Sequence, residues 1–280
     1  MSFNGLLLKV ARRWIAGVDQ ESALSDAKKS NSKGFGVILN FLGEDVTERA
    51  VAETHLEEYL RLQQAMDSNG IRGFASFKPT QLGLGADNEG AVQRIQKIAS
   101  NAERLHQLLW VDMEGSKFTS ETLRLYLELL QTHRGVGMAL QSYMRRSEAD
   151  LKVILENGGK VRLVKGAYRE PPDVVFTTRD QVNANFRALM KLLFETGDDF
   201  AIGTHDSKLV EEAKKLAESR HVNFRFEMLK GIRNDLKAEL VASGYKVSEY
   251  LPYGQEWYAY SRRRLTEHPS NVLLLIRSIF

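Results

Sequence analysis

Short apolar runs alternate along the chain with longer segments whose apolar residues recur at helical spacing. In the segment 182–193, apolar residues return every three or four positions, so they share one face of a helix that can pack on a sheet. Regular alternation of strand-like and helix-like segments indicates βα units around a parallel sheet. The runs that we predict to be strands are 37–42, 71–77, 108–113, 135–140, 161–164, 201–204, 224–228 and 247–251.

Helices are predicted between these runs. Their ranges are 52–62, 123–130, 182–193, 209–217 and 236–241, and Gly244 stands where the last of them would end. An open doubly wound sheet shares this rhythm, but about eight βα units in 280 residues match a closed (βα)8 barrel better. Because no linker or shift in composition divides the chain, we expect one α/β barrel domain over residues 1–280, in which residues 1–36 form an N-terminal helical extension.

Composition narrows the class of protein. The 43% of hydrophobic residues is enough to bury one large core. No Cys is present, which excludes disulfides, thiolate metal sites and a cysteine nucleophile, and favours a reducing, cytoplasmic location. The 39 basic and 36 acidic residues are spread along the chain, so nucleic acid is not expected as a partner.

The beginning of the chain is the one segment that suggests a membrane surface. No apolar run reaches the roughly 20 residues of a membrane span, and three leucines at 6–8 are followed at once by Lys9, Arg12 and Arg13. Residues 3–16 could form a basic amphipathic helix that contacts a membrane peripherally. A helix packed on the barrel is the favoured alternative.

Polar residues follow the predicted strands, at the barrel end where active sites of this architecture lie. Any one of them could be a solvated loop residue or a polar group satisfied inside the barrel, but their joint placement indicates a site. An arginine inside a strand, as at Arg162, needs an anionic or electron-rich partner because an unpaired buried charge is costly. The strand-end residues are Lys78, Asp112, Glu114, Gln141, Arg162, Lys165, Thr204, His205, Asp206, Glu227, Lys230, Tyr250 and Tyr253.

A second group of residues stands near the end of the chain. Tyr260, Arg263, Arg264 and Glu267 are three or four positions apart and share one helical face, whereas Arg262 points away from it. Two adjacent guanidinium groups repel one another unless an anion lies between them, and a substrate carboxylate is a natural candidate. The alternative is a basic helix end in solvent.

Other chemical signatures are missing from the sequence. Residues 135–137 lack the third glycine of a dinucleotide-binding turn, and no Walker-type loop occurs. The six histidines show no zinc-ligand spacing, so no metal is expected. His205 is the only one at a strand end, and no Ser-His-Asp pattern recruits it.

Several motifs together give a specific resemblance. The segment 161–168 reads VRLVKGAY, and VDME at 111–114, ALQSY at 139–143, GTHD at 203–206, FEMLKGIR at 226–233 and YSRRRL at 260–265 accompany it in order. In these motifs the chain resembles the proline dehydrogenases, including the proline dehydrogenase domain of bifunctional proline-utilisation enzymes. The resemblance extends from WIAG at 14–17 to Asn271. The surroundings of Lys78 are a looser match.

The resemblance implies a modified TIM-like (βα)8 barrel that binds FAD and oxidises L-proline to Δ1-pyrroline-5-carboxylate, with electrons passed to a quinone. It places Arg162 near the flavin N5, and Lys165, Gly166 and Ala167 at the phosphates, where a positive charge and close backbone approach suit an anion. Further implied FAD contacts are Met113, Gln141, Thr204 and His205.

On the substrate side, the resemblance makes Lys78, Arg263 and Arg264 a clamp for the proline carboxylate. Asp112 would orient and neutralise these cations, with Glu267 as a further counter-charge. Tyr250 and Tyr260 would pack on the proline ring. The implied catalytic residues are Asp112 and Arg162. No side chain is an evident general base for the amine proton, and solvent is the alternative acceptor.

The resemblance also implies partners. Nothing resembles an aldehyde-oxidising domain, so the product is expected to pass to a separate pyrroline-5-carboxylate dehydrogenase, and peripheral contact with the inner membrane would bring the quinone within reach. Three alternatives stay open: a Schiff-base aldolase using Lys165 or Lys230, a non-catalytic barrel, and hydroxyproline as the substrate unless Tyr250 occludes its hydroxyl.

Overall fold

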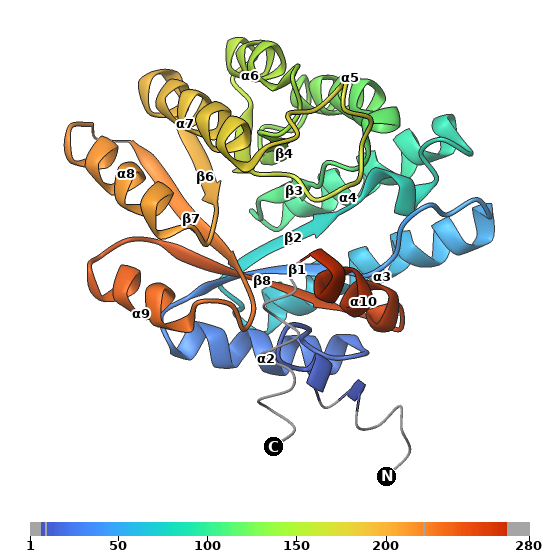
Figure 1. Ribbon diagram of the computed structural model, residues 1–280. Coiled ribbons are helices and arrows are strands. Elements are labelled where there is room, and N and C mark those ends of the chain that lie inside the picture. The colour runs from blue at the N-terminus through green and yellow to red at the C-terminus, as the bar shows by residue number, and fades with distance from the viewer. Residues whose placement is uncertain (1–6, 9, 221, 268–280) are drawn as a thin grey trace.

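Eight parallel strands close into a barrel in sequence order (Figure 1). The computed structural model describes residues 7–8, 10–220 and 222–267, with side chains up to residue 262. Each predicted strand is confirmed, with its start and its end within two residues of the prediction. The strands are β1 (Gly36–Phe41), β2 (Gly73–Phe77), β3 (Leu109–Val111), β4 (Val136–Gln141), β5 (Lys160–Val164), β6 (Asp199–Gly203), β7 (Asn223–Leu229) and β8 (Val247–Tyr253).

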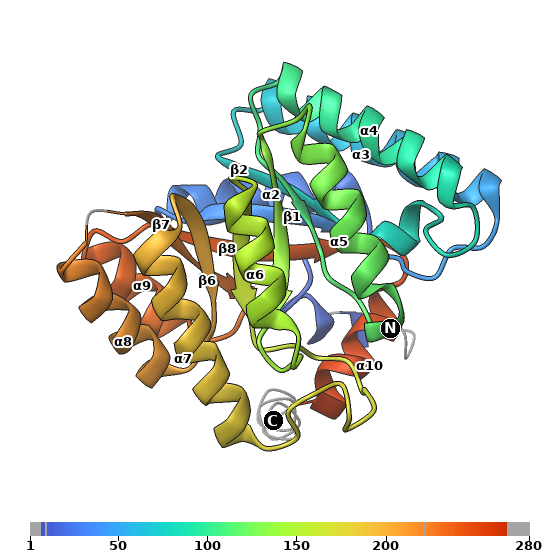
Figure 2. The same ribbon diagram turned by 90° about the horizontal axis from the view of Figure 1, so that it is seen from above.

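Helices surround the strands on the outside (Figure 2). All five predicted helices are confirmed, each extended at one or both ends. Thr178 and Gln181 form a reciprocal capping box that starts α7. The described helices are α2 (Gln20–Ser32), α3 (Arg49–Ser68), α4 (Asn88–Arg104), α5 (Ser116–Leu130), α6 (Ser147–Glu156), α7 (Arg179–Thr196), α8 (Ser207–Glu218), α9 (Asn234–Ala242) and α10 (Trp257–Glu267), with a 3-10 turn η1 (Pro79–Leu82).

Strand residues alternate between two environments. In β5, Val161 and Leu163 belong to the large apolar core shared with the helices, whereas Arg162 contacts residues of β7 and β8 across the barrel. In β7, Phe226 and Met228 likewise lie in that outer core. Every second side chain therefore points into the barrel, where charged groups meet one another.

The barrel differs from a regular (βα)8 barrel near the beginning and near the end of the chain. The N-terminal helix α2 packs against β1 and β8, where the helix after β8 would lie in a regular barrel. The last helix, α10, lies instead at the mouth: Tyr260 packs with Ala11, Ile15 and Leu42 and also lines the central cavity. The predictions of a modified TIM-like barrel and of a helical N-terminal extension are confirmed for the described residues.

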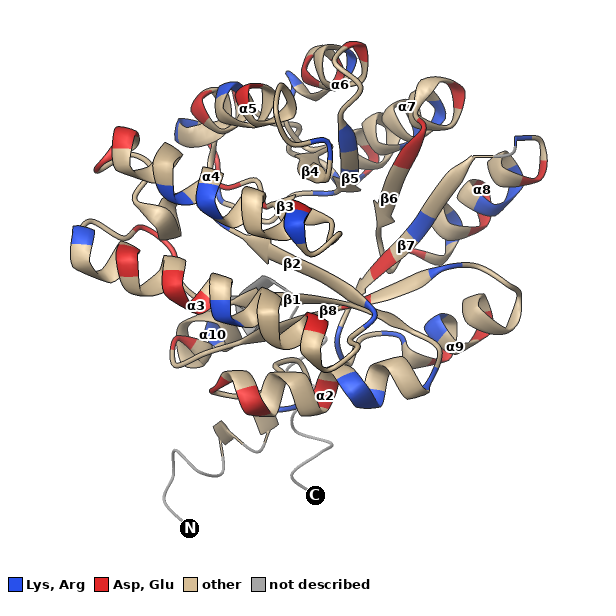
Figure 3. Ribbon diagram, turned by 180° about the vertical axis from the view of Figure 1, so that it is seen from behind, with Lys and Arg blue, Asp and Glu red and all other residues tan. Residues whose placement is uncertain are grey.

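The first residues hold α10 in this position. The indole N–H of Trp14 donates a 2.9 Å hydrogen bond to the hydroxyl of Ser261, and the Ala16 N–H donates to the Pro252 carbonyl at 2.7 Å. Residues 10–16 therefore pack on the barrel, while residues 3–6 and 9 of the predicted amphipathic helix lie outside the described residues. Among the helices that the structure describes, none is long and apolar enough to cross a membrane. Lys, Arg, Asp and Glu are interspersed over the outer helices (Figure 3).

Candidate active site

A cavity of about 970 Å³ opens at the carboxyl ends of the strands. This volume lies at the upper end of the usual range for small-molecule and cofactor sites. The structure brings all the predicted site residues with described side chains to its wall, whereas the side chains of Arg263 and Arg264 lie outside the described residues. The predicted residues that line the cavity are Lys78, Asp112, Met113, Gln141, Arg162, Lys165, Gly166, Ala167, Thr204, His205, Tyr250 and Tyr260.

Three strand-end residues singled out in the sequence do not line the cavity. Tyr253 points to the outer face of the barrel, where its hydroxyl donates to Glu58 at 2.7 Å. Lys230 binds Asp26 of α2. Glu114 lies behind the wall and bonds to Thr80. Proximity to a strand end does not fix which way a side chain points.

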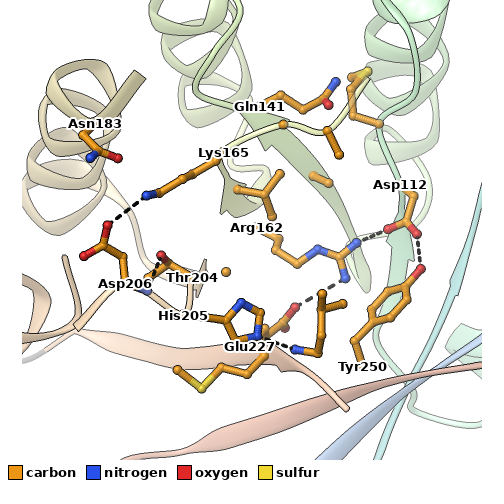
Figure 4. A pocket seen from close by; sticks show the side chains of 18 of the residues that line it. Asp112, Gln141, Arg162, Lys165, Asn183, Thr204, His205, Asp206, Glu227 and Tyr250 are labelled. Carbon is orange, nitrogen blue, oxygen red and sulfur yellow. Dashed lines mark hydrogen bonds and ion pairs between the residues drawn. The ribbon is translucent and has the colours of Figure 1, made fainter. Parts of the chain in front are cut away.

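Arg162 is the centre of the cavity wall (Figure 4). Its Nη2 donates to Oδ1 of Asp112, and its Nη1 lies 3.4 Å from Oε2 of Glu227. The guanidinium also lies 5.2 Å from the ring of Trp110 and 5.6 Å from that of Tyr250. Only 5% of Arg162 is exposed, so two carboxylates and two aromatic faces stabilise a charge that would otherwise be costly to bury.

Asp112 connects Arg162 to the predicted substrate side. Its other oxygen, Oδ2, accepts a 2.7 Å hydrogen bond from the hydroxyl of Tyr250. Burial raises the pKa of Tyr250 above its ordinary value, so the phenol stays protonated and remains a donor near neutral pH. Both carboxylate oxygens of Asp112 are thus engaged, and the side chain is held in one orientation.

Glu114 ties together two other parts of the wall. It accepts hydrogen bonds from the backbone N–H of Thr80, at 3.0 Å, and from the Thr80 hydroxyl, at 2.5 Å. The Gln141 side-chain amide donates to the Glu114 carbonyl at 2.9 Å. Burial raises the pKa of Glu114, while the Thr80 hydrogen bonds and the charge of Lys78 act in the opposite direction. Through its carboxylate Glu114 anchors the turn after Lys78, and through its backbone carbonyl it binds the end of β4.

The loop after β5 can take its shape only because residue 166 is glycine. Gly166 has φ +106°, and a Cβ there would lie 2.3 Å from the ring of Tyr143. Farther along the loop, the Glu170 carboxylate accepts hydrogen bonds from the backbone N–H of Ser116, at 2.7 Å, and from the Ser116 hydroxyl. The loop therefore crosses from β5 to the start of α5 and is fixed at both places.

Lys165 and His205 have defined partners at the same side of the cavity. The Lys165 amine binds Oδ2 of Asp206 at 3.0 Å. Burial raises the pKa of Asp206, but the hydrogen bond and charge of Lys165 outweigh it, and the net pKa lies below the ordinary value. The Leu229 N–H donates to Nε2 of His205 at 2.9 Å, so that nitrogen is an acceptor and His205 in its neutral form carries its proton on Nδ1.

Several polar residues of the wall were not predicted. Arg179, Asn183 and Arg187 lie four residues apart on α7 and form a stripe beside the apolar face that supported the helix prediction. The remaining basic ones are Lys208 and Arg233. A polar stripe at i, i+4 and i+8 was the available signal, but the same stripe on any outer helix usually faces water.

The lining has an excess of positive charge. Among the described residues it includes seven Lys or Arg and four Asp or Glu, a formal excess of three positive charges. The Oδ1 atom of Asn183 is buried and has no hydrogen-bond partner in the described part of the chain. The wall near α7 and α8 therefore suits an anionic ligand that also carries hydrogen-bond donors.

The proline dehydrogenase family model matches residues 23–274. The chain belongs to the proline dehydrogenase family. It is 32% identical to proline dehydrogenase 2 of Bacillus subtilis (strain 168), covering 100% of this chain and 96% of the relative, and 31% identical to proline dehydrogenase of Deinococcus radiodurans, covering 96% and 90%. The resemblance found in the sequence motifs is confirmed, and it assigns the chain to the oxidoreductases of proline catabolism.

Solved structures show the same fold. Proline utilization A from Bdellovibrio bacteriovorus, inactivated by N-propargylglycine, superposes with a TM-score of 0.87 at 22% identity, over 94% of this chain and 33% of that one. A mutant of Bradyrhizobium japonicum proline utilization A gives a TM-score of 0.78 at 20% identity, over 90% and 30%. The chain thus has the fold of about one third of these longer proteins.

The aldolase alternative loses its support at this point. A Schiff-base lysine needs a neutral amine that faces the substrate. Lys230 binds Asp26 outside the cavity, and the Lys165 amine is paired with Asp206. Family membership and these two ion pairs both favour the dehydrogenase.

Proposed function

We propose that the chain oxidises L-proline to Δ1-pyrroline-5-carboxylate by hydride transfer from proline C5 to FAD, with the electrons passed on to a quinone. The observation that carries the proposal is the position of Arg162, a buried cation in the wall of a large cavity, between the predicted cofactor and substrate residues. Roles of individual residues follow from this position and from the family.

The cavity fits a dinucleotide with a charged pyrophosphate. Its volume of about 970 Å³ is sufficient for a large cofactor, and its positive excess offsets phosphate charge. At Gly203 a Cβ would come within 2.7 Å of Val164, and Gly166 likewise leaves the wall without a side chain. The unpartnered Oδ1 of Asn183 would accept a hydrogen bond from such a ligand.

Within this cavity, Lys165, Gly166 and Ala167 would hold the phosphates, with Arg179 and Arg187 close by. Arg162, Met113, Gln141, Thr204 and His205 would surround the isoalloxazine. When bound, FAD would supply the acceptor for two electrons and one proton. Arg162 is already fixed by Asp112 and Glu227, so little reorganisation is needed to present its guanidinium.

Substrate would bind on the side of Lys78. Lys78, Arg263 and Arg264 would clamp the proline carboxylate, with Glu267 as a counter-charge, and Tyr250 and Tyr260 would bound the ring. Asp112 has two tasks in this arrangement: it holds Arg162 through one oxygen and fixes Tyr250 through the other. The distance and direction of C5 are thereby set by rigid strand ends.

The reaction breaks the C5–H bond with both its electrons and forms a C5–N double bond from the nitrogen lone pair. The amine must therefore be unprotonated, and its proton passes to solvent because no side chain is an evident base.

The proposal also includes the electron acceptor, the enzyme that takes up the product and the membrane. Electrons leave to a quinone, the product passes to a separate pyrroline-5-carboxylate dehydrogenase, and the protein works in the cytoplasm in peripheral contact with the inner membrane. Neither the non-catalytic alternative nor the aldolase gives a role to Arg162.

Product trapping tests this proposal. Purified protein with L-proline and a soluble quinone analogue is expected to form a cyclic imine, trapped by o-aminobenzaldehyde, in equal amount to the quinol. Imine formed from hydroxyproline but not from proline would reassign the substrate. No imine from either compound, with covalent substrate retained after borohydride, would reject the proposal in favour of Schiff-base chemistry.

A further inference from the structure

Glu227 is a buried carboxyl in the cavity wall to which neither the family motifs nor the proposed reaction gives a role beyond its contact with Arg162. It lies on β7 with 5% of its surface exposed and faces Arg162 across the barrel. Its outer neighbours Phe226 and Met228 fill the apolar core, so the strand has no alternative orientation for it. Burial of an acidic residue at this place is costly and calls for a compensating interaction.

Arg162 is the group that compensates for the burial of Glu227, and it is shared with Asp112. Nη2 binds Asp112, and Nη1 lies 3.4 Å from Oε2 of Glu227, so one cation faces two carboxylates on opposite sides. Asp112 has a second donor in Tyr250. Glu227 has no tyrosine donor of this kind: its Oε1 is buried without a hydrogen bond of good geometry among the described residues, and the indole of Trp110 makes only the smallest of the contributions that lower its pKa.

The other charged group near Glu227 does not replace Arg162. Arg225 lies two residues earlier on the same strand and is bound to Asp199 at 2.5 Å, toward the opposite end of the barrel. Burial raises the pKa of Glu227, and the charges of Arg162 and Arg225 oppose this effect. The net pKa of Glu227 lies above its ordinary value, and the main interaction that favours the ionised carboxylate is its pairing with the guanidinium that faces the predicted flavin site.

We infer that Glu227 is a positioning residue that holds Arg162 from the side opposite Asp112 and places a negative charge behind it, which sets how strongly the cavity favours reduced flavin. This inference rests on the proposed function, because it assumes that Arg162 lies beside the flavin. Electron-rich reduced flavin is stabilised by positive charge and destabilised by negative charge in a dry cavity. Removing the charge of Glu227 should therefore favour reduction.

The test is the midpoint potential of FAD bound to Glu227→Gln, measured by spectroelectrochemistry at pH 7.5 without substrate. The glutamine keeps the shape and can still accept a hydrogen bond from Arg162, but it removes the charge. We expect the equilibrium to shift about tenfold toward reduced flavin, which for a two-electron couple is about 30 mV more positive. Glu227→Asp, which keeps the charge, should stay close to the wild-type potential.

Glu249→Gln is the matched control. Glu249 is also a buried carboxyl of the barrel, but it points outward, accepting from Ser30 at 2.7 Å and binding Lys237. This variant should lose stability without a change in potential. A wild-type potential in Glu227→Gln, or an equal shift in Glu249→Gln, would overturn the inference.

Binding of FAD to the apoprotein separates this inference from the proposed function. If wild-type protein binds FAD tightly and Glu227→Gln leaves the potential unchanged, only the inference fails. If wild-type protein binds no FAD at all, the proposed function fails first. If Glu227→Gln does not fold, the Asp variant carries the test through its affinity for FAD: retraction of the carboxylate from Arg162 should weaken binding, and unchanged affinity would contradict the positioning role.

Discussion

The hydroxyl of Tyr250, on β8, donates a 2.7 Å hydrogen bond to Oδ2 of Asp112 at the end of β3, on the far side of the mouth. The bond joins a residue predicted to contact the substrate to the residue that holds Arg162. It is partly buried and charge-assisted, which makes it one of the stronger hydrogen bonds of the site.

Tyr250→Phe should lower kcat/KM for proline by about tenfold or more, because a hydrogen bond to a charged group contributes about 1.5–3 kcal/mol. Flavin content should not change. Tyr126→Phe removes a buried hydroxyl that bonds the Lys160 carbonyl outside the cavity, and it should reduce stability alone. Equal kinetic effects of the two substitutions in steady-state assays would show that the Asp112 contact has no catalytic importance.

Gly166→Ala should raise the Kd of FAD at least about tenfold, because the new Cβ would clash with the ring of Tyr143 and displace the loop after β5. Fluorescence titration of the apoprotein with FAD measures this Kd. Gly244→Ala is the control: Gly244 also has a positive φ, +85°, but a Cβ there meets nothing within 4 Å. That variant should cost about 1 kcal/mol of stability with normal FAD affinity. Tight binding by Gly166→Ala would contradict the role of this loop.

Arg264→Ala should raise KM for proline by about tenfold or more while FAD stays bound, since the carboxylate clamp loses one charged fork. Arg262 is exposed on the same helix and points away from the predicted face, so Arg262→Ala should leave KM unchanged. Steady-state kinetics with flavin-loaded protein make the comparison. Unchanged saturation by proline in Arg264→Ala would refute the clamp assignment.

Acid should destabilise the barrel through Asp199. Burial raises the pKa of Asp199, but its bonds and charges with Lys160 and Arg225 together lower it below the ordinary value of 3.8. A lowered folded-state pKa means that this stabilisation is fully present above about pH 4 and is lost as the pH falls through the lower value.

Asp199→Asn should therefore reduce the free energy of unfolding by about 2 kcal/mol at pH 7, because it leaves two partly buried cations without their partner. Urea unfolding at several pH values measures the difference from wild type. We expect this difference in unfolding free energy to become smaller only below about pH 4. If wild type and variant have equal free energies of unfolding at pH 7, the ion pairs of Asp199 with Lys160 and Arg225 contribute nothing to stability.

The strands could be predicted from the sequence because β-rich runs bounded by turns carry their own pattern, as in residues 161–164 and 224–228. Helices α4 and α6 were not predicted. The buried face of α4 includes Ile95 and Ile98 at helical spacing beside three alanines, so its pattern was present in the sequence and was overlooked, whereas α6 is only 10 residues long.

The site was predictable where it depended on strand ends and motifs, and not where it depended on distant contacts. Trp14 and Ser261 are 247 positions apart, yet their hydrogen bond helps to place α10 over the mouth. Arg179 and Asn183 face the cavity only because the loop after β5 brings the start of α7 there. Glu227 was visible as a strand-end residue, but its pairing with Arg162 required the closed barrel.

The visible spectrum of the purified protein, before and after anaerobic addition of L-proline, tests the central claim most directly. We predict the absorption bands of a bound flavin and their bleaching by proline, which would report cofactor, substrate and direction of electron flow together. Protein that binds no flavin even after incubation with FAD, or bound flavin that proline leaves oxidised, would contradict the account.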